Sequence, residues 1–170
     1  MLFRSECTSS THTAITNGDG LIRIGRDSVG DYFSGIIDDV RIYDRILSAD
    51  EVKKIYELGG TTKLNTTITT DDLSEGLVGH WTFDGSTVNA GTNQITDVSG
   101  NGNTASTTGM DASTTTTQGR IGQGLQLDGA DDEVRVSDSA TVDMLGEIYT
   151  LTAWFKLNSV GGTQAIAVKG

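Results

Sequence analysis

The segment Asp97-Val98-Ser99-Gly100-Asn101-Gly102 has the residue types and spacing of the first half of a calcium-binding loop. Ca²⁺ takes oxygen ligands, which fall here at alternate positions, and glycine permits the sharp turn. The glutamate expected at the twelfth position of an EF-hand loop is absent, because Thr108 stands there. An ion would therefore need ligands from elsewhere in the fold. Asp97, Asn101 and Asn103 fit equally well as turn residues that cap their own backbone, so both interpretations stay open.

Two other acidic groups have residue types suited to chemistry. Asp38-Asp39 is a pair of carboxylates, the groups that glycoside hydrolases use as acid and base. Adjacent strand residues point to opposite faces, so without a bulge these carboxylates cannot share one substrate. Pairing of either with Arg41 or a loop amide is the favoured interpretation. The acidic run 128–133 is typical of a solvated turn between two strands.

The nucleophiles and bases of common enzymes are scarce. His12 and His80 are the only histidines, and Cys7 is the only cysteine. His80 is expected on a strand, facing away from Trp81, without the partners of a catalytic base or a zinc site. We therefore expect no catalytic residues and interpret the chain as not an enzyme.

Period-two alternation predicts strands, with a single short helix, around these groups. The expected strands include residues 21–25, 36–43, 76–84 and 149–157, with shorter ones around 124–127, 134–136 and 166–168. A capping box, Ser48-Ala49-Asp50-Glu51, and the stop signal Gly59-Gly60 predict a helix of about two turns after the strand at 36–43. Such a pattern favours an all-β fold, an antiparallel β-sandwich of the jelly-roll type.

The alternation also assigns side chains to faces. In the strand at 76–84, Leu77, Trp81 and Phe83 are expected on one face and Val78 on the other. In the strand at 149–157, Trp154 is expected on the face opposite Leu151 and Phe155. That ring is either a core residue between two layers or a platform on which a sugar stacks, and the core interpretation is favoured.

Composition excludes several classes of partner. With 12 basic and 23 acidic residues, the net charge of −11 opposes binding of nucleic acid or anionic lipid, while cationic ligands, neutral sugars and metal ions stay open. No apolar stretch approaches the ~18 residues of a membrane span, and Met1-Leu2-Phe3-Arg4 lacks the apolar run of a signal peptide. The sequence thus predicts no membrane insertion. The 170 residues suffice for one ordinary domain or two very small ones.

Two longer segments resemble a known family. The segment Tyr32-Phe-Ser-Gly-Ile-Ile-Asp-Asp-Val-Arg-Ile-Tyr-Asp-Arg-Ile-Leu-Ser48 resembles the closing part of laminin-G-like, concanavalin A-like jelly-roll modules, which are repeated in secreted bacterial proteins. The segment Gly76-Leu-Val-Gly-His-Trp-Thr-Phe-Asp-Gly85 resembles the opening strand of the same module. Shorter matches at 97–103, 127–129 and 151–155 follow in the family's order.

The closing part precedes the opening part, so the chain looks cut from a tandem array. On this interpretation residues 1–60 are the C-terminal part of one module, residues 61–75 are a Thr-rich linker, and residues 76–170 are the truncated N-terminal part of a second module. The first and last strands are neighbours in this family. The resemblance therefore implies that residues 36–43 pair with residues 77–83 across the linker, as in a circular permutant.

The resemblance implies a noncatalytic, calcium-assisted module that binds carbohydrate or protein, at the cell surface or outside the cell. Its partners would be a glycan or an extracellular protein, besides the neighbouring modules of the array. The cofactor would be Ca²⁺, with Asp84 and Asp39 joining Asp97, Asn101 and Asn103 as metal ligands. Two alternatives stay open: a structural spacer or adhesin repeat without a ligand of its own, and an accessory part of a glycoside hydrolase.

Overall fold

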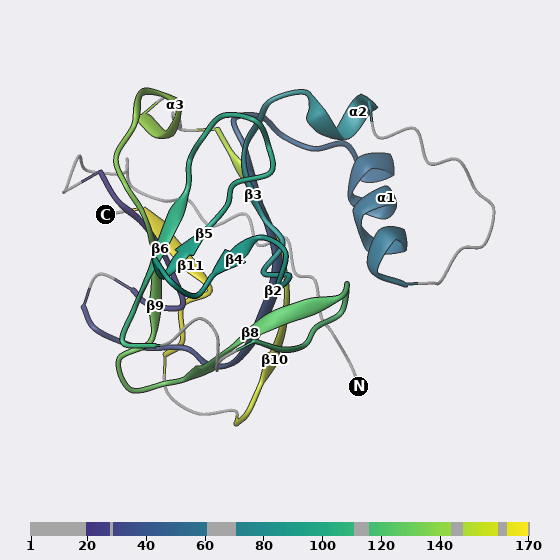
Figure 1. The fold of residues 1–170 in the computed structure, drawn as a ribbon. Helices are drawn as coiled ribbons and strands as arrows, with labels where there is room; N and C mark the ends of the chain where they lie inside the picture. Colours follow the sequence, from purple (N-terminus) through teal and green to yellow (C-terminus); the bar gives the residue numbers. More distant parts are fainter. Residues whose placement is uncertain are drawn as a thin grey trace.

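The computed structural model describes residues 20–27, 29–60, 71–110, 116–143, 148–159 and 163–169, which form two antiparallel sheets around an apolar core (Figure 1). The six-stranded sheet contains, in spatial order, β11 (Ala167–Lys169), β1 (Ile22–Ile24), β9 (Glu133–Val136), β6 (Ala105–Thr108), β5 (Gln94–Ile95) and β4 (Val88–Asn89). The other contains β10 (Thr150–Leu157), β2 (Ser34–Tyr43), β8 (Gln123–Asp128) and β7 (Thr116–Gln118), and β3 (Leu77–Trp81) pairs with β2. The expected all-β sandwich is confirmed.

Strand β2 is the centre of its sheet. One edge of β2 pairs with β10, from Tyr43 opposite Thr150 to Gly35 opposite Leu157. Its other edge is divided, because β8 pairs with residues 34–37 and β3 pairs with residues 40–43. The predicted pairing of residues 36–43 with residues 77–83 is thereby confirmed, with Val40 opposite Trp81.

Strand β1 has the same role in the other sheet, between β9 and β11. Its Arg23 lies directly opposite Arg135 of β9, a pairing of like charges that is unfavourable by itself. Glu133 offsets this repulsion: its carboxylate is almost fully buried and accepts hydrogen bonds from Arg135 and from Arg26, the latter at 3.2 Å. Both sheets thus combine strands from before and after residues 61–75.

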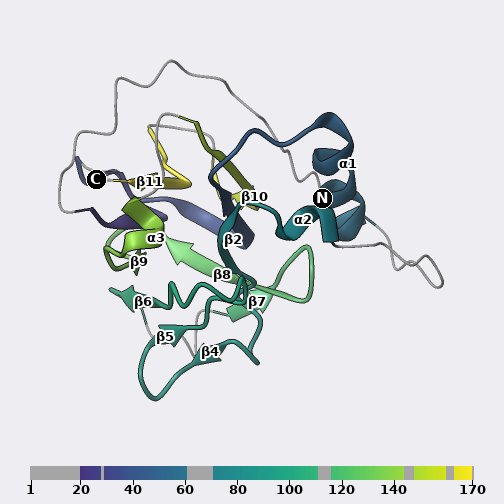
Figure 2. The same ribbon diagram turned by 90° about the horizontal axis from the view of Figure 1, so that it is seen from above.

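Helix α1 (Ala49–Gly60) covers the outer face of the smaller sheet. Figures 1 and 2 show β2 and β10 between α1 on one side and β9 and β11 on the other. The predicted capping box forms, since the Ser48 hydroxyl accepts from the Glu51 N–H at 3.3 Å and the Glu51 carboxylate accepts from the Ser48 N–H at 2.7 Å. The helix has 12 residues rather than about two turns, and it includes Gly59. A Cβ on Gly59 would lie 2.6 Å from the Trp154 ring, so glycine permits this close approach.

The expectation of a single helix was wrong. Two four-residue helices, α2 (Asp71–Ser74) and α3 (Ala140–Asp143), are also present. Each has only about one turn, too short to produce an apolar periodicity in the sequence. None of the helices in the described ranges has the length and apolar character needed to cross a bilayer.

The predicted faces of residues 77 and 78 were also wrong. The pairing register shifts between Ile42 and Tyr43, whose partners are Gly79 and Leu77, so Val78 is the extra residue of a β-bulge. Val78 consequently joins Trp81 in the core between the sheets. Leu77 instead packs with the outer cluster around Tyr43, beside α1.

The shared sheets predict that the two halves stay together when the connection between them is cut. A specific protease site placed between residues 61 and 70 is expected to give a nicked protein that migrates as one particle and melts in one transition, because β2 is paired on both edges with strands from beyond residue 76. Size-exclusion chromatography and calorimetry check this. Separation of the fragments without denaturant would contradict it.

Candidate functional site

Asp97 organises the predicted calcium loop by accepting hydrogen bonds. Its Oδ1 accepts from the backbone N–H groups of His80 and Ser99, at 2.9 and 2.8 Å. Its Oδ2 accepts from the Ser99 hydroxyl at 2.8 Å and from the Asn103 N–H at 2.9 Å. Both oxygens of this buried carboxylate are therefore engaged by the protein, and they fasten the loop to β3.

The two asparagines of the loop have similar roles. The Nδ2 group of Asn101 donates to the Val78 carbonyl at 3.1 Å, and that of Asn103 donates to the same carbonyl at 2.8 Å. The Asn103 side-chain oxygen accepts from the hydroxyls of Ser139 and Thr141, at 2.8 and 2.9 Å. These contacts match the turn-residue interpretation, in which polar side chains hold the backbone of their own region.

The other two predicted calcium ligands lie at different places. Asp84 accepts from the N–H of Gln123 at 2.8 Å, whereas Asp39 contacts His80 at 2.7 Å and Arg41 at 3.1 Å. In the described part of the chain, the carboxylates of Asp39, Asp84 and Asp97 do not form a group that could hold a metal ion by themselves. Calcium binding at the five predicted residues stays a prediction.

Asp39 forms a nearly buried ion pair on the outer face of β2. Burial opposes its ionisation, but the hydrogen bond from His80 and the charge of Arg41 outweigh it and hold the pKa of Asp39 below its usual value. His80 comes from β3 and is paired opposite Arg41, so this contact links the two strands. His80 thus faces away from the core, as expected, but it is a partner of Asp39 and only partly exposed.

A bulge places Asp38 and Asp39 on the same face of the sheet. Asp38 lies opposite Trp154 and Arg41 lies opposite Thr152, so two residues of β2 stand opposite Ala153 alone. Asp39 adopts a φ of +50°, a conformation that aspartate tolerates better than most residues. The expectation of opposite faces was conditional on an unbulged strand, and the structure shows the bulge.

The two carboxylates nevertheless have separate partners. The Oδ2 of Asp38 accepts from the backbone N–H groups of Arg120 and Ile121, at 2.6 and 2.8 Å. Burial is the largest influence on this carboxyl, and together with the charges of Asp39 and Asp84 it raises the pKa of Asp38 to about 7. The favoured interpretation, pairing with Arg41 or a loop amide, is confirmed for both residues.

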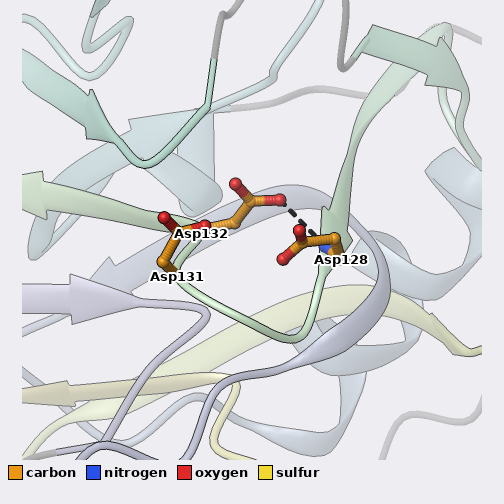
Figure 3. A group of neighbouring side chains, drawn as sticks. All are labelled: Asp128, Asp131 and Asp132. Carbon is orange, nitrogen blue, oxygen red and sulfur yellow. Dashed lines mark hydrogen bonds between the residues drawn. The ribbon is translucent and has the colours of Figure 1, made fainter.

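Three acidic side chains meet at the β8–β9 turn. The carboxylates of Asp128, Asp131 and Asp132 lie within 4.8 Å of one another, the one such group among the described residues (Figure 3). The buried Asp132 accepts from the N–H of Asp128 at 2.8 Å, and Asp128 accepts from the N–H of Ala130 at 2.7 Å. These bonds shape the predicted turn, but Asp132 and Glu133 are buried, so the expectation of a solvated acidic run was wrong for these two residues.

A groove of about 180 Å³ runs along β10, the last strand of its sheet. Its floor is formed by residues 150–155, and its walls are Val52, Ile55 and Tyr56 of α1 on one side and Ile166 on the other. Asp39 contributes a carboxylate, and the buried hydroxyl of Thr152 has no hydrogen-bond partner among the described residues. Sequence analysis missed this groove, because it depends on how α1 packs against the sheet.

Trp154 lies beneath this groove as a packed residue. It is buried, and its ring centroid lies 5.5 Å from that of the half-exposed Tyr56. The Arg120 guanidinium also lies over the Trp154 ring, 5.1 Å from its centroid. The core interpretation of Trp154 is thereby confirmed, and the exposed aromatic ring at the groove is Tyr56.

Comparison with known families gives one match. Residues 4–53 match a family model described as the concanavalin A-like lectin/glucanases superfamily, a range that includes β1 and β2. No curated protein and no solved structure matches the chain. Laminin-G-like and concanavalin A-like domains are generally noncatalytic binding modules. The resemblance of residues 76–85 to an opening strand lies outside the matched range and stays a prediction.

Substitution of Asp38 tests the environment of its carboxyl. Between pH 4 and 7, approximately, folded Asp38 keeps a proton that the unfolded chain releases, so its contribution to stability falls as the pH rises through this range. Asp38→Asn keeps an oxygen for the two loop amides but cannot ionise. The variant's gain in thermal midpoint over the parent protein is expected to be larger at pH 8 than at pH 5. Equal differences at both pH values, with the exposed Asp131→Asn as control, would contradict this.

Substitution of Asp97 separates loop capping from calcium binding. Asp97→Ala leaves the buried N–H of Asn103 and its neighbours without an acceptor, which is expected to cost about 3 kcal/mol. Because capping needs no ion, the loss should be the same in EDTA and in millimolar calcium. Chemical denaturation measures it, with Asp131→Ala as control. If calcium stabilises the parent protein but not Asp97→Ala, the result would support the calcium prediction instead.

Proposed function

We propose that the chain binds an extracellular or cell-surface ligand, carbohydrate or protein, in the groove between β10 and α1; the match of residues 4–53 to the concanavalin A-like lectin/glucanase family model supports this proposal. The module holds its ligand without transforming it.

The groove is the observation that carries this proposal. Ligand sites are typically concave and largely apolar, with a few polar groups that orient the ligand. Here the apolar walls are Val52, Ile55 and Ile166, and the polar groups are Asp39 and Thr152. A buried hydroxyl without a partner is costly, and a ligand that hydrogen-bonds to Thr152 would recover that loss.

The electrostatics of the chain narrow the ligand class. A net charge of −11 disfavours acidic ligands through long-range repulsion and leaves neutral and basic ones. Within the groove, Asp39 is already paired with Arg41 and His80, so its charge is largely balanced. Neutral glycans and non-acidic proteins are therefore the classes that we propose.

The half-exposed ring of Tyr56 provides the test. We expect Tyr56→Ala to weaken binding of a ligand found by screening neutral glycans and extracellular proteins by about tenfold or more, because tyrosine is among the residues that contribute most to binding energy where a ligand covers them. Isothermal titration of both proteins, in calcium and in EDTA, measures the change. Ile46→Ala removes an exposed side chain outside the groove and serves as control. Unchanged affinity in Tyr56→Ala would place the ligand elsewhere.

A further inference from the structure

We propose that the groove receives an extended segment of a separate, non-acidic polypeptide, which adds a strand to the outer edge of β10, the last strand of its sheet among the described residues. This inference rests on the proposed function of the groove and specifies its ligand. It follows from the floor of the groove, from its two walls and from the charge of the chain.

The floor of the groove is the edge of a sheet. β10 is the last strand in the order β10-β2-β8-β7, and in the described sheets nothing pairs with its outer edge. Such an edge presents a row of backbone N–H and C=O groups that can pair with an extended chain. A glycan lacks alternating amide donors and carbonyl acceptors at the spacing of a strand. The floor therefore favours a polypeptide.

The edge also lacks most of the features that prevent strand addition. Proteins commonly protect edge strands with charged residues or proline. The chain contains no proline, and Lys156 is the single charged residue of β10. The eight residues of β10 are long enough to guide an added strand over several hydrogen bonds.

The two walls would receive the two faces of the added strand. Successive side chains of a strand point to opposite faces, so one set would meet Val52 and Tyr56 of α1. The other set would meet Ile166 of the opposite wall together with Leu151 and Phe155 of the floor, all three of which pack against the core but are only partly buried. Apolar side chains on both faces of the added strand would extend the core and cover these residues.

The charge of the chain argues for a separate partner rather than a second copy. Two copies would each carry a net charge of −11, and their association through this edge would bring like charges together. A neutral or basic segment meets no such repulsion. The partner is accordingly an extended, non-acidic segment with alternating or continuous apolar side chains.

The test uses a short acetylated and amidated peptide in which valine and threonine alternate between terminal lysines. We expect it to bind the intact chain and to slow hydrogen exchange of the β10 amides. The same peptide with alternate backbone amides N-methylated keeps its charge and side chains but cannot complete the ladder, so we expect at least tenfold weaker binding. Equal binding of both peptides would overturn strand addition.

Substitutions on the two walls locate the peptide. Val52→Lys and Ile166→Lys each place a charge beside the added strand and should weaken binding at least tenfold. Val29→Lys changes a valine that is 83% exposed and lies outside the groove, so it should leave affinity unchanged. Thermal melts identify any variant that fails to fold. If one of the two wall variants does not fold, the affinity of the other one is the test. Folded wall variants with parental affinity would overturn the inference.

Two further outcomes separate this inference from the proposed function. In the first, a neutral glycan binds, Tyr56→Ala weakens its binding, and the peptide does not bind. This result would overturn strand addition while supporting the groove as the binding site. A concentration-dependent dimer in sedimentation that is abolished by Ile166→Lys would show a second copy on this edge and overturn the inference. Failure of the peptide, the neutral glycans and the extracellular proteins of the screen to bind would overturn both proposals.

Discussion

The pairing of β2 along both of its edges is the constraint on which the rest of the structure depends. A central strand has no free backbone edge, and β2 meets this condition only by pairing with β10 on one side and with β8 and β3 on the other. All three partners come from beyond residue 76. The two segments that resemble the end and the beginning of a module are therefore joined in one sheet, and the core between the sheets contains side chains from both.

The acidic residues take their roles from this arrangement. Asp97 and the loop asparagines hold the chain against β3, and Asp38 holds the turn that precedes β8. Asp39 joins β2 to His80 of β3. Residue types that suggest metal or acid-base chemistry in the sequence thus serve mainly as acceptors for backbone amides. Buried backbone groups without partners would otherwise be costly, which explains why carboxylates occupy these positions.

The groove has a different origin, since it lies at the edge of the sheet, beyond the last pair of strands, β2 and β10. β10 is paired along one edge, and α1 covers the outer face of the sheet only as far as this strand. The edge of β10, the wall of α1 and Ile166, which precedes β11, together make the concave surface on which the proposed binding depends. The family match of residues 4–53 and the strand edge of β10 are independent observations, and both support the proposed binding role.

Local pattern was enough to predict the all-β class, the helix after residue 48 and its capping box, the alternation of Val40 and Ile42 into the core, and the turn at 128–132. These features depend on residues close together in the chain. The pairing of residues 36–43 with 77–83 was predicted through family resemblance, not from local pattern. The bulges at Asp39 and Val78, the hydrogen-bond partners of the five predicted calcium ligands, and the groove required the tertiary structure. The reason is physical: a bulge and a groove arise from register and packing between strands and helices distant in sequence, and a single residue's shift moves a side chain to the other face.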